Sequence, residues 1–392
     1  MRLLFVTPRL PALPCHEAAR LAAAQLIDRL AGRHTIAVVA ATGGGDTPAQ
    51  HAWLAERAAF VETAPLGRWR HAWTGRPGDG LAALGALARR AAARFVPDVI
   101  HLEGALLAPL ARATDAPSVL ACHDCATLRA RDMRRAGAST WRRLVARVAE
   151  RVETTWARTW FGAARACVVD SEDERRALAE HVPSERIDVV PTGIDDVTYA
   201  YRRRGDPWRL VFTGDWSSPR DVAAARRLAL AILPRVRHEI PRLELLLAGS
   251  NLAGDAVRAL GALPGVRITG ALTDVRASLW GAAVYVSPLH AGFSRKARLL
   301  EPMALGTPVV ASAPTLVAMP DAVPGQHVLA ADGDEEFARS IALLLRAPRL
   351  ANTVARNARD LVERRYTWRA VAARYEALYA RLAPMRAAEA AA

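Results

Sequence analysis

Short runs of β-branched and other apolar residues alternate with longer stretches rich in Ala, Leu and Arg along the whole chain. This alternation constrains the fold most, because strands that alternate with helices form parallel sheets covered by helices on both faces. The expected strands form one series at 3–7, 35–40, 99–101, 118–122, 166–169 and 187–190, and another at 210–213, 243–248, 266–269, 284–287, 308–311 and 328–330. Two series predict an α/β protein with two doubly wound domains rather than one large sheet.

The boundary between the two series lies in a polar, Arg-rich stretch, residues 199–207, which follows a turn at 191–193. We therefore expect a first domain over 1–200 and a second over 205–369, with a final helix at 370–392 packing back on the first domain. In such proteins ligands bind at the carboxyl ends of the strands and in the cleft between domains.

The composition of the chain limits the classes of partner and the cell compartment that we expect. Of the 392 residues 52% are hydrophobic, enough for a core in each domain, and the formal net charge is +14. This charge predicts attraction to nucleotides, nucleic acid or an acidic membrane face, and no recognised nucleic-acid-binding module is visible. No apolar run is long enough to span a bilayer, and the short apolar start ends at Pro8, unlike a signal peptide. We expect a cytoplasmic protein.

The single lysine of the chain, among fifty-two arginines, lies in its most site-like segment. Lys296 is flanked by Arg295 and Arg298, and Glu301 and Pro302 follow. Proline is tolerated in the first turn of a helix, so a helix should begin close to Glu301, with its amide groups facing the cations. Such an arrangement suits a phosphate, and Glu301 suits a ribose diol. The alternative is a charged surface turn.

The cysteines give little support for metal or redox chemistry. Cys122 and Cys125 form one CxxC pair, but a zinc site would need a second pair at comparable spacing, and the sequence has none. We therefore expect no bound metal.

A strongly helical stretch at 139–161 carries tryptophan and aliphatic residues along one stripe, with arginines mainly off it. The pattern is typical of a helix packed on the core with a solvated arginine face. The alternative is a basic helix that lies at an anionic membrane surface.

Short motifs follow one another in a fixed order through the second half of the chain. They are 211–214, 232–234, 246–249, 265–270, 286–289, 300–312 and 366–368, of which Leu300-Glu301-Pro302-Met303-Ala304-Leu305-Gly306 opens the most diagnostic. In order and spacing they resemble the carboxyl-terminal half of GT-B glycosyltransferases of family 4, the group 1 sugar transferases, and most nearly the exopolysaccharide-associated ones. The first half matches more loosely, through the opening strand and 98–101, 122–124, 169–171 and 190–195.

The resemblance implies two Rossmann-like domains that face each other across a cleft. It also implies a retaining transfer of a sugar from a nucleotide-diphosphate donor, in which cations replace a metal and no cofactor is needed. Glu301 corresponds to the glutamate that holds the donor ribose. Arg298 and Lys296 occupy places where relatives often carry a phosphate-binding lysine and an arginine.

The first domain contributes its own expected residues. His123 matches the histidine that approaches the transferred sugar and is the expected catalytic residue; the alternative is a structural histidine at a strand end. Gly193, with Asp195, matches the loop that closes the cleft. The expected donor-binding residues are Glu301, Arg298, Lys296, Arg295, Gly214, Gly292 and Gly193.

Two departures from the family pattern raise a rival interpretation. Phe293 replaces a glutamate that touches the sugar in many relatives, and the loop at 11–17 lacks the usual glycine. A non-catalytic GT-B scaffold of a glycan-assembly complex is therefore the alternative. Our expectation remains a hexosyltransferase-type enzyme of polysaccharide biosynthesis. Its expected partners are a nucleotide sugar and a glycan or lipid-linked acceptor, with peripheral contact at the inner, anionic membrane face.

Overall fold

The computed structural model divides the chain into two compact units. Unit 1 comprises Met1–Gly193 and Trp368–Ala392, and unit 2 comprises Ile194–Thr367. The structure describes all residues except 14, 16–17, 66, 68–76, 124–139, 203–204, 252–257, 272–273, 290–296, 318 and 390–392.

Unit 1 is built on a seven-stranded sheet in the order β3-β2-β1-β4-β5-β6-β7, and all its strand pairs are parallel. Its strands are β1 (Arg2–Thr7), β2 (Thr35–Thr42), β3 (Phe60–Pro65), β4 (Val99–Glu103), β5 (Ser118–Cys122), β6 (Ala166–Val169) and β7 (Ile187–Val189). The helices are α1 (Ala18–Leu30), α2 (Pro48–Ala55), α3 (Asp79–Phe95), α5 (Thr140–Trp160), α6 (Glu172–Leu178) and α15 (Trp368–Glu389), with 3₁₀ turns at Ala105–Arg112, Phe161–Ala163 and Ser184–Arg186.

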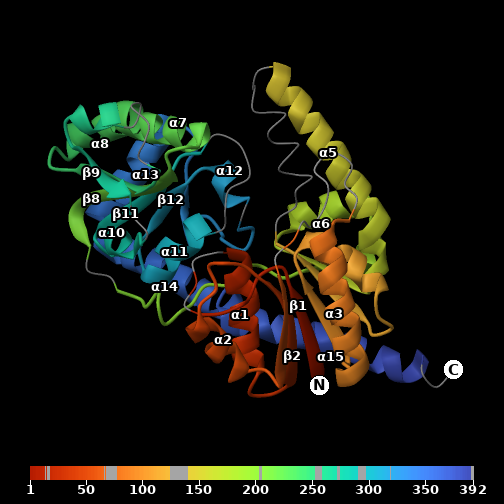
Figure 1. Cartoon of the computed structure of the whole chain (residues 1–392). Helices are drawn as coiled ribbons and strands as arrows, with labels where there is room; N and C mark the ends of the chain where they lie inside the picture. Colours follow the sequence, from red (N-terminus) through yellow and green to blue (C-terminus); the bar gives the residue numbers. More distant parts are fainter. Residues whose placement is uncertain are drawn as a thin grey trace. The chain divides into compact units, whose positions relative to one another are not determined.

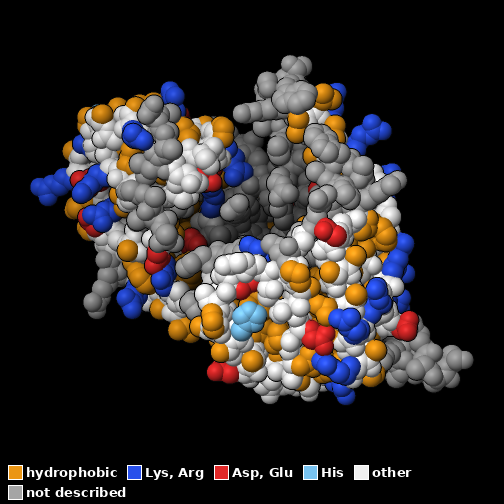
Figure 2. Space-filling model, in the orientation of Figure 1, with side chains coloured by type: hydrophobic (Ala, Val, Ile, Leu, Met, Phe, Trp, Pro, Cys, Tyr) orange, Lys and Arg blue, Asp and Glu red, His pale blue; other side chains and the backbone are white. Residues whose placement is uncertain are grey.

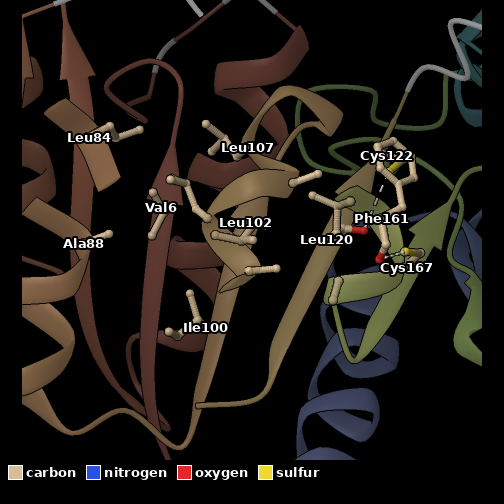
Figure 3. Packing of buried hydrophobic residues seen from close by; sticks show 14 of the residues in the cluster. Val6, Leu84, Ala88, Ile100, Leu102, Leu107, Leu120, Cys122, Phe161 and Cys167 are labelled. Carbon is tan, nitrogen blue, oxygen red and sulfur yellow. Dashed lines mark hydrogen bonds between the residues drawn. The ribbon is translucent and has the colours of Figure 1, made fainter. Parts of the chain in front are cut away.

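Strand alternation places one hydrophobic core on each face of this sheet. Leu4 and Val6 of β1 pack with α3 and with Trp156 of α5, in the core that Figure 3 shows in part. Leu3 and Phe5 point the other way and pack with α1, α2 and α15. The last helix, α15, contacts α1 and β4, so the end of the chain is part of unit 1 (Figure 1).

Unit 2 repeats this architecture with a six-stranded parallel sheet in the order β10-β9-β8-β11-β12-β13. Its strands are β8 (Asp206–Asp215), β9 (Glu244–Ser250), β10 (Val266–Ala271), β11 (Ala282–Ser287), β12 (Val309–Ala311) and β13 (Leu329–Ala330). Its helices are α7 (Pro219–Arg227), α8 (Leu233–Glu239), α10 (Arg276–Trp280), α11 (Ala297–Leu305), α12 (Ala313–Leu316), α13 (Asp334–Arg346) and α14 (Pro348–Arg365), with a π segment at Leu228–Ile232 and a 3₁₀ turn at Ala259–Ala262. Helices α7, α8 and α13 share a core on one face, and α10, α11 and α14 share one on the other. The predicted α/β class with two doubly wound sheets is confirmed.

The expected start of the helix at Glu301 is wrong. Helix α11 begins at Ala297, and Pro302 lies within it. Its side chains Leu299, Leu300 and Met303 are buried in the core shared with α14. Proline here removes one hydrogen bond near the start of a helix, and burial of these side chains offsets that loss. Arg298 therefore lies on the helix itself rather than in the loop before it.

Candidate functional sites

The first candidate site lies at the carboxyl edge of the unit 2 sheet, where α/β proteins bind ligands. Arg298, in the first turn of α11, donates from one terminal nitrogen to the carbonyl oxygen of Thr213 near the end of β8, at 3.4 Å. The hydroxyls of Thr213 and Tyr285 of β11 lie 3.1 Å apart beneath it. The start of α11 is thus fixed at the end of the two central strands.

Arg298 is held there by a buried carboxylate that the sequence did not reveal. Asp221 of α7 is fully buried and accepts a hydrogen bond from the other terminal nitrogen of Arg298. It also accepts from the backbone N–H of Asp215 at 2.9 Å, and Arg220 lies 3.4 Å from it. The Arg298 side chain is 12% exposed, so one edge of the guanidinium is committed to the protein.

Glu301 lies one turn further along α11 and contacts Tyr199. The Tyr199 hydroxyl donates to a carboxylate oxygen of Glu301 at 3.1 Å, and the Arg276 guanidinium stacks over the Tyr199 ring. Burial raises the pKa of Glu301 from 4.5 to about 7, against the opposing effect of the hydrogen bond from Tyr199. Burial and the charge of Glu301 likewise raise the pKa of the Tyr199 hydroxyl. Tyr199 is therefore a second site residue that sequence reasoning missed.

Gly214, at the end of β8, has a packing role in the structure. A Cβ there would lie 2.6 Å from the ring of Trp216, and the neighbouring Gly249 of β9 is equally closed by the carbonyl of Gly214. Without side chains, the two glycines let β8 and β9 approach each other closely and let the Trp216 indole pack against β8. The other expected donor-binding residues of this unit, Arg295, Lys296 and Gly292, lie outside the described residues.

The second candidate site lies at the carboxyl edge of the unit 1 sheet, around His123. The ring follows β5 and lies between two carboxylates: Nδ1 is 3.1 Å from Asp170 Oδ1, and Nε2 is 3.0 Å from Glu103 Oε1. Glu103 ends β4 and Asp170 follows β6, so the three residues come from adjacent strands. Neither carboxylate was expected from the sequence as a site residue, although Glu103 is a charged residue at the end of a fully buried strand.

Gly193 lies against α15. A Cβ at Gly193 would lie 2.6 Å from the ring of Trp368, so this position accepts no larger residue without movement of the indole. Asp195 accepts hydrogen bonds from the backbone and the hydroxyl of Thr198 and shapes the next turn. The structure gives both residues local roles in the backbone that leads from unit 1 to unit 2.

Metal ligands do not cluster in the described part of the chain. No group of three or more His, Cys, Asp or Glu residues there is placed to hold a metal ion. Cys122 is buried and its thiol donates to the carbonyl of Leu120 at 3.9 Å (Figure 3). Cys125, the other half of the CxxC pair, lies outside the described residues.

Helix α5 divides its apolar stripe between two environments. Trp156 is buried and donates to the carbonyl of Ala105, whereas Leu144, Val145 and Val148 are 50%, 40% and 36% exposed. The interpretation of the whole stripe as core is therefore wrong for Leu144, Val145 and Val148. Figure 2 shows orange and blue side chains together at the upper end of α5. Among the described helices, we find none with the length and apolar character that crossing a bilayer requires.

Two curated relatives share part of this sequence. Both are phosphatidyl-myo-inositol mannosyltransferases. The protein from Propionibacterium freudenreichii is 31% identical over 147 residues, 36% of this chain and 36% of the relative. The protein from Mycolicibacterium smegmatis is 29% identical over 221 residues, 53% of this chain and 55% of the relative. The chain thus matches about a third to a half of the length of these relatives.

A solved structure extends the likeness to nearly the whole fold. The HepE protein of Anabaena, in complex with UDP, superposes with a TM-score of 0.63 at 17% identity, covering 97% of this chain and 100% of that chain. At this identity the likeness shows the GT-B fold. The family models described as "Glycosyltransferase Family 4" and "Glycosyl transferases group 1" match residues 21–197 and 207–347 respectively. Because these matches occupy most of both halves, the chain belongs to the family 4, group 1 glycosyltransferases.

Proposed function

We propose that the chain is a glycosyltransferase that moves a sugar from a nucleotide-diphosphate donor to a glycan or lipid-linked acceptor. The observation that carries the proposal is that Arg298 and Glu301 lie one turn apart on α11, at the carboxyl edge of the unit 2 sheet. A guanidinium suits the diphosphate, because its planar fork can bind two phosphate oxygens. A carboxylate one turn away suits the two hydroxyls of a ribose.

In this proposal the bond to Asp221 determines which N–H groups of Arg298 can bind a ligand. One terminal nitrogen of the guanidinium is bonded to Asp221 and the other to the carbonyl of Thr213, and each carries a second hydrogen for a ligand. Asp221 also balances the charge of Arg298 while the site is empty. Lys296 and Arg295, which precede the helix, would then supply the net positive charge that a departing diphosphate needs in the absence of a metal.

Several observations support this donor and this class of acceptor. The structural neighbour from Anabaena is a complex with UDP, so the same fold holds a nucleoside diphosphate there. The two curated relatives are by name transferases that act on a phosphatidylinositol lipid. We therefore propose a lipid-linked or glycan acceptor. From the family pattern we add retention of configuration, metal independence and a role in polysaccharide assembly to the proposal.

The exposed half of α5 is the proposed contact with an anionic membrane. Leu144, Val145 and Val148 lie on the same helix as the exposed Arg147 and Arg151. Apolar side chains beside arginines suit the boundary between lipid headgroups and acyl chains. A lipid-linked acceptor would be presented at such a surface.

A panel of nucleoside diphosphates and nucleotide sugars tests the proposal. A ligand that binds the folded chain raises its unfolding temperature, so the donor should stand out in a thermal-shift screen without added metal. Mass spectrometry then follows release of the diphosphate and transfer of the sugar to lipid or glycan acceptors. Binding without transfer or hydrolysis for any member would favour the alternative, a non-catalytic scaffold. Binding of no member would overturn the proposal.

A further inference from the structure

Four polar side chains in contact run through the interior of unit 1 from α15 to His123. It begins on α15, where the Tyr379 hydroxyl lies 2.7 Å from His101 Nδ1. His101 Nε2 lies 2.9 Å from Glu103 Oε2, and all three residues are buried. An ionised carboxylate only accepts, so His101 Nε2 donates to Glu103; when the His101 ring is neutral, its Nδ1 accepts from the Tyr379 hydroxyl. The helix that returns after unit 2 thus fixes the orientation of Glu103.

The second oxygen of Glu103 faces His123. Oε1 lies 3.0 Å from His123 Nε2, a contact at ion-pair distance that lacks ordinary hydrogen-bond geometry. On the other side of the ring, Nδ1 lies 3.1 Å from Asp170 Oδ1, and Thr192 donates to Asp170 Oδ2 at 2.5 Å. Both ring nitrogens of His123 therefore meet a carboxylate oxygen, and each carboxylate is oriented by another group.

Charge reinforces this arrangement. Burial alone would lower the pKa of His123, but the charges of Glu103 and Asp170 outweigh it and raise that pKa well above 6.5. Burial alone would raise the pKa of Glu103, but the charge of His123 and the hydrogen bond from His101 lower it to about 2. The other titratable groups that face the cluster in the described structure are His101, Cys122, Glu174, Tyr375 and Tyr379.

We propose that Glu103 is a positioning residue that, together with Asp170, clamps the His123 ring from both sides and keeps both of its nitrogens protonated. This inference deepens the proposed function, on which it rests for the role of His123 toward a sugar. A ring protonated on both nitrogens cannot accept a proton from an acceptor hydroxyl. His123 then works in transfer as a fixed cation of set orientation, and not as a general base.

The Glu103→Gln variant removes the charge and keeps the shape. A glutamine carbonyl can still accept from His101 Nε2, and its amide can face the unprotonated Nε2 of a neutral His123. The ring would keep its Nδ1–H toward Asp170. This variant therefore separates loss of charge from loss of packing. Asp170→Asn removes the other carboxylate and is the second variant.

Nitrogen-15 NMR of the full chain, labelled at its 10 histidines, reads the protonation of His123 directly. Subtraction of the His123→Gln spectrum identifies its signals. Between about pH 5.5 and about pH 8.5, a range around the ordinary histidine pKa of about 6.5, the wild-type ring should keep the signature of an imidazolium. In Glu103→Gln its titration midpoint should move down into this range. Glu62→Gln removes a carboxylate of β3, in the same sheet, that pairs with Arg94 of α3, and should leave the His123 midpoint unmoved.

The outcomes separate the clamp from the proposed reaction, because the NMR titration needs neither donor nor acceptor. Wild-type His123 that titrates like a free histidine would overturn the clamp, even if neither variant folded. A Glu103→Gln spectrum with an unchanged imidazolium would overturn it as well. Where transfer is measurable, the Glu103→Gln rate should depend on pH around the new midpoint and the wild-type rate should not. Absence of transfer with an intact imidazolium would refute the proposed function and leave the clamp standing.

Discussion

Removal of the Arg298 side chain should destabilise unit 2 through Asp221. In Arg298→Met the fully buried carboxylate of Asp221 loses its main counter-ion, a change that costs about 3–5 kcal/mol when one partner of a buried pair is removed. Arg220 remains 3.4 Å away on the more exposed side, so we expect the lower end, about 3 kcal/mol. For a unit of about 170 residues this corresponds to a fall of about 6–12 °C in unfolding temperature.

The double variant Asp221→Asn with Arg298→Met should recover most of that loss. It leaves no buried charge, and the Asn carbonyl can still accept from the backbone N–H of Asp215. Differential scanning calorimetry of the single and double variants measures both effects. The control is Arg209→Met, which breaks the half-exposed pair with Asp206 and should cost less than about 1 kcal/mol. Equal unfolding temperatures for the single and the double variant would refute the argument.

Three further predictions follow from the two sites and from α5. The folded chain keeps a proton on Glu301 up to about pH 7, whereas the unfolded chain loses it near 4.5. The stability of unit 2 should therefore fall as pH rises between these values, and Glu301→Gln should remove that fall in urea unfolding; an identical pH profile would exclude Glu301 as its source. His123→Ala should reduce sugar transfer more than nucleotide binding, and parallel losses would point to a structural histidine. Binding to anionic vesicles should be measurable by sedimentation at low salt and weaken as salt rises, whereas indifference to lipid charge would rule out electrostatic docking on α5.

Periodicity was sufficient to predict the central strands of both sheets, because these runs are buried and their residues alternate between two cores. Hydrophobic periodicity did not predict β3, and the position of this strand explains why. Phe60–Pro65 pairs only with β2 at the sheet edge and is largely half-exposed, with Glu62 and Pro65 interrupting the apolar run. A strand that buries little carries little hydrophobic signal.

Some residues of the candidate sites are close together in the sequence, and others are brought together only by the fold. Glu301 and Arg298 belong to one short motif and could be selected together. Their partners could not, because Tyr199 precedes Glu301 by 102 residues and Asp221 precedes Arg298 by 77. Only the folded sheet brings such residues to one edge. The sequence therefore selected Arg298 and Glu301 as candidates, but it did not indicate that Arg298 is paired with a buried carboxylate.

The most direct test of the account is calorimetric titration of the chain, without metal, with the nucleoside diphosphate that the thermal-shift screen selects and with its nucleoside. The diphosphate should bind more tightly than the nucleoside to the wild type. Glu301→Gln should weaken both ligands by about 1–3 kcal/mol, because both contain the ribose. The Asp221→Asn, Arg298→Met double variant should weaken the diphosphate alone. Equal affinity of the wild type for the diphosphate and the nucleoside, or unchanged diphosphate affinity in both variants, would contradict a diphosphate site at this edge of the unit 2 sheet.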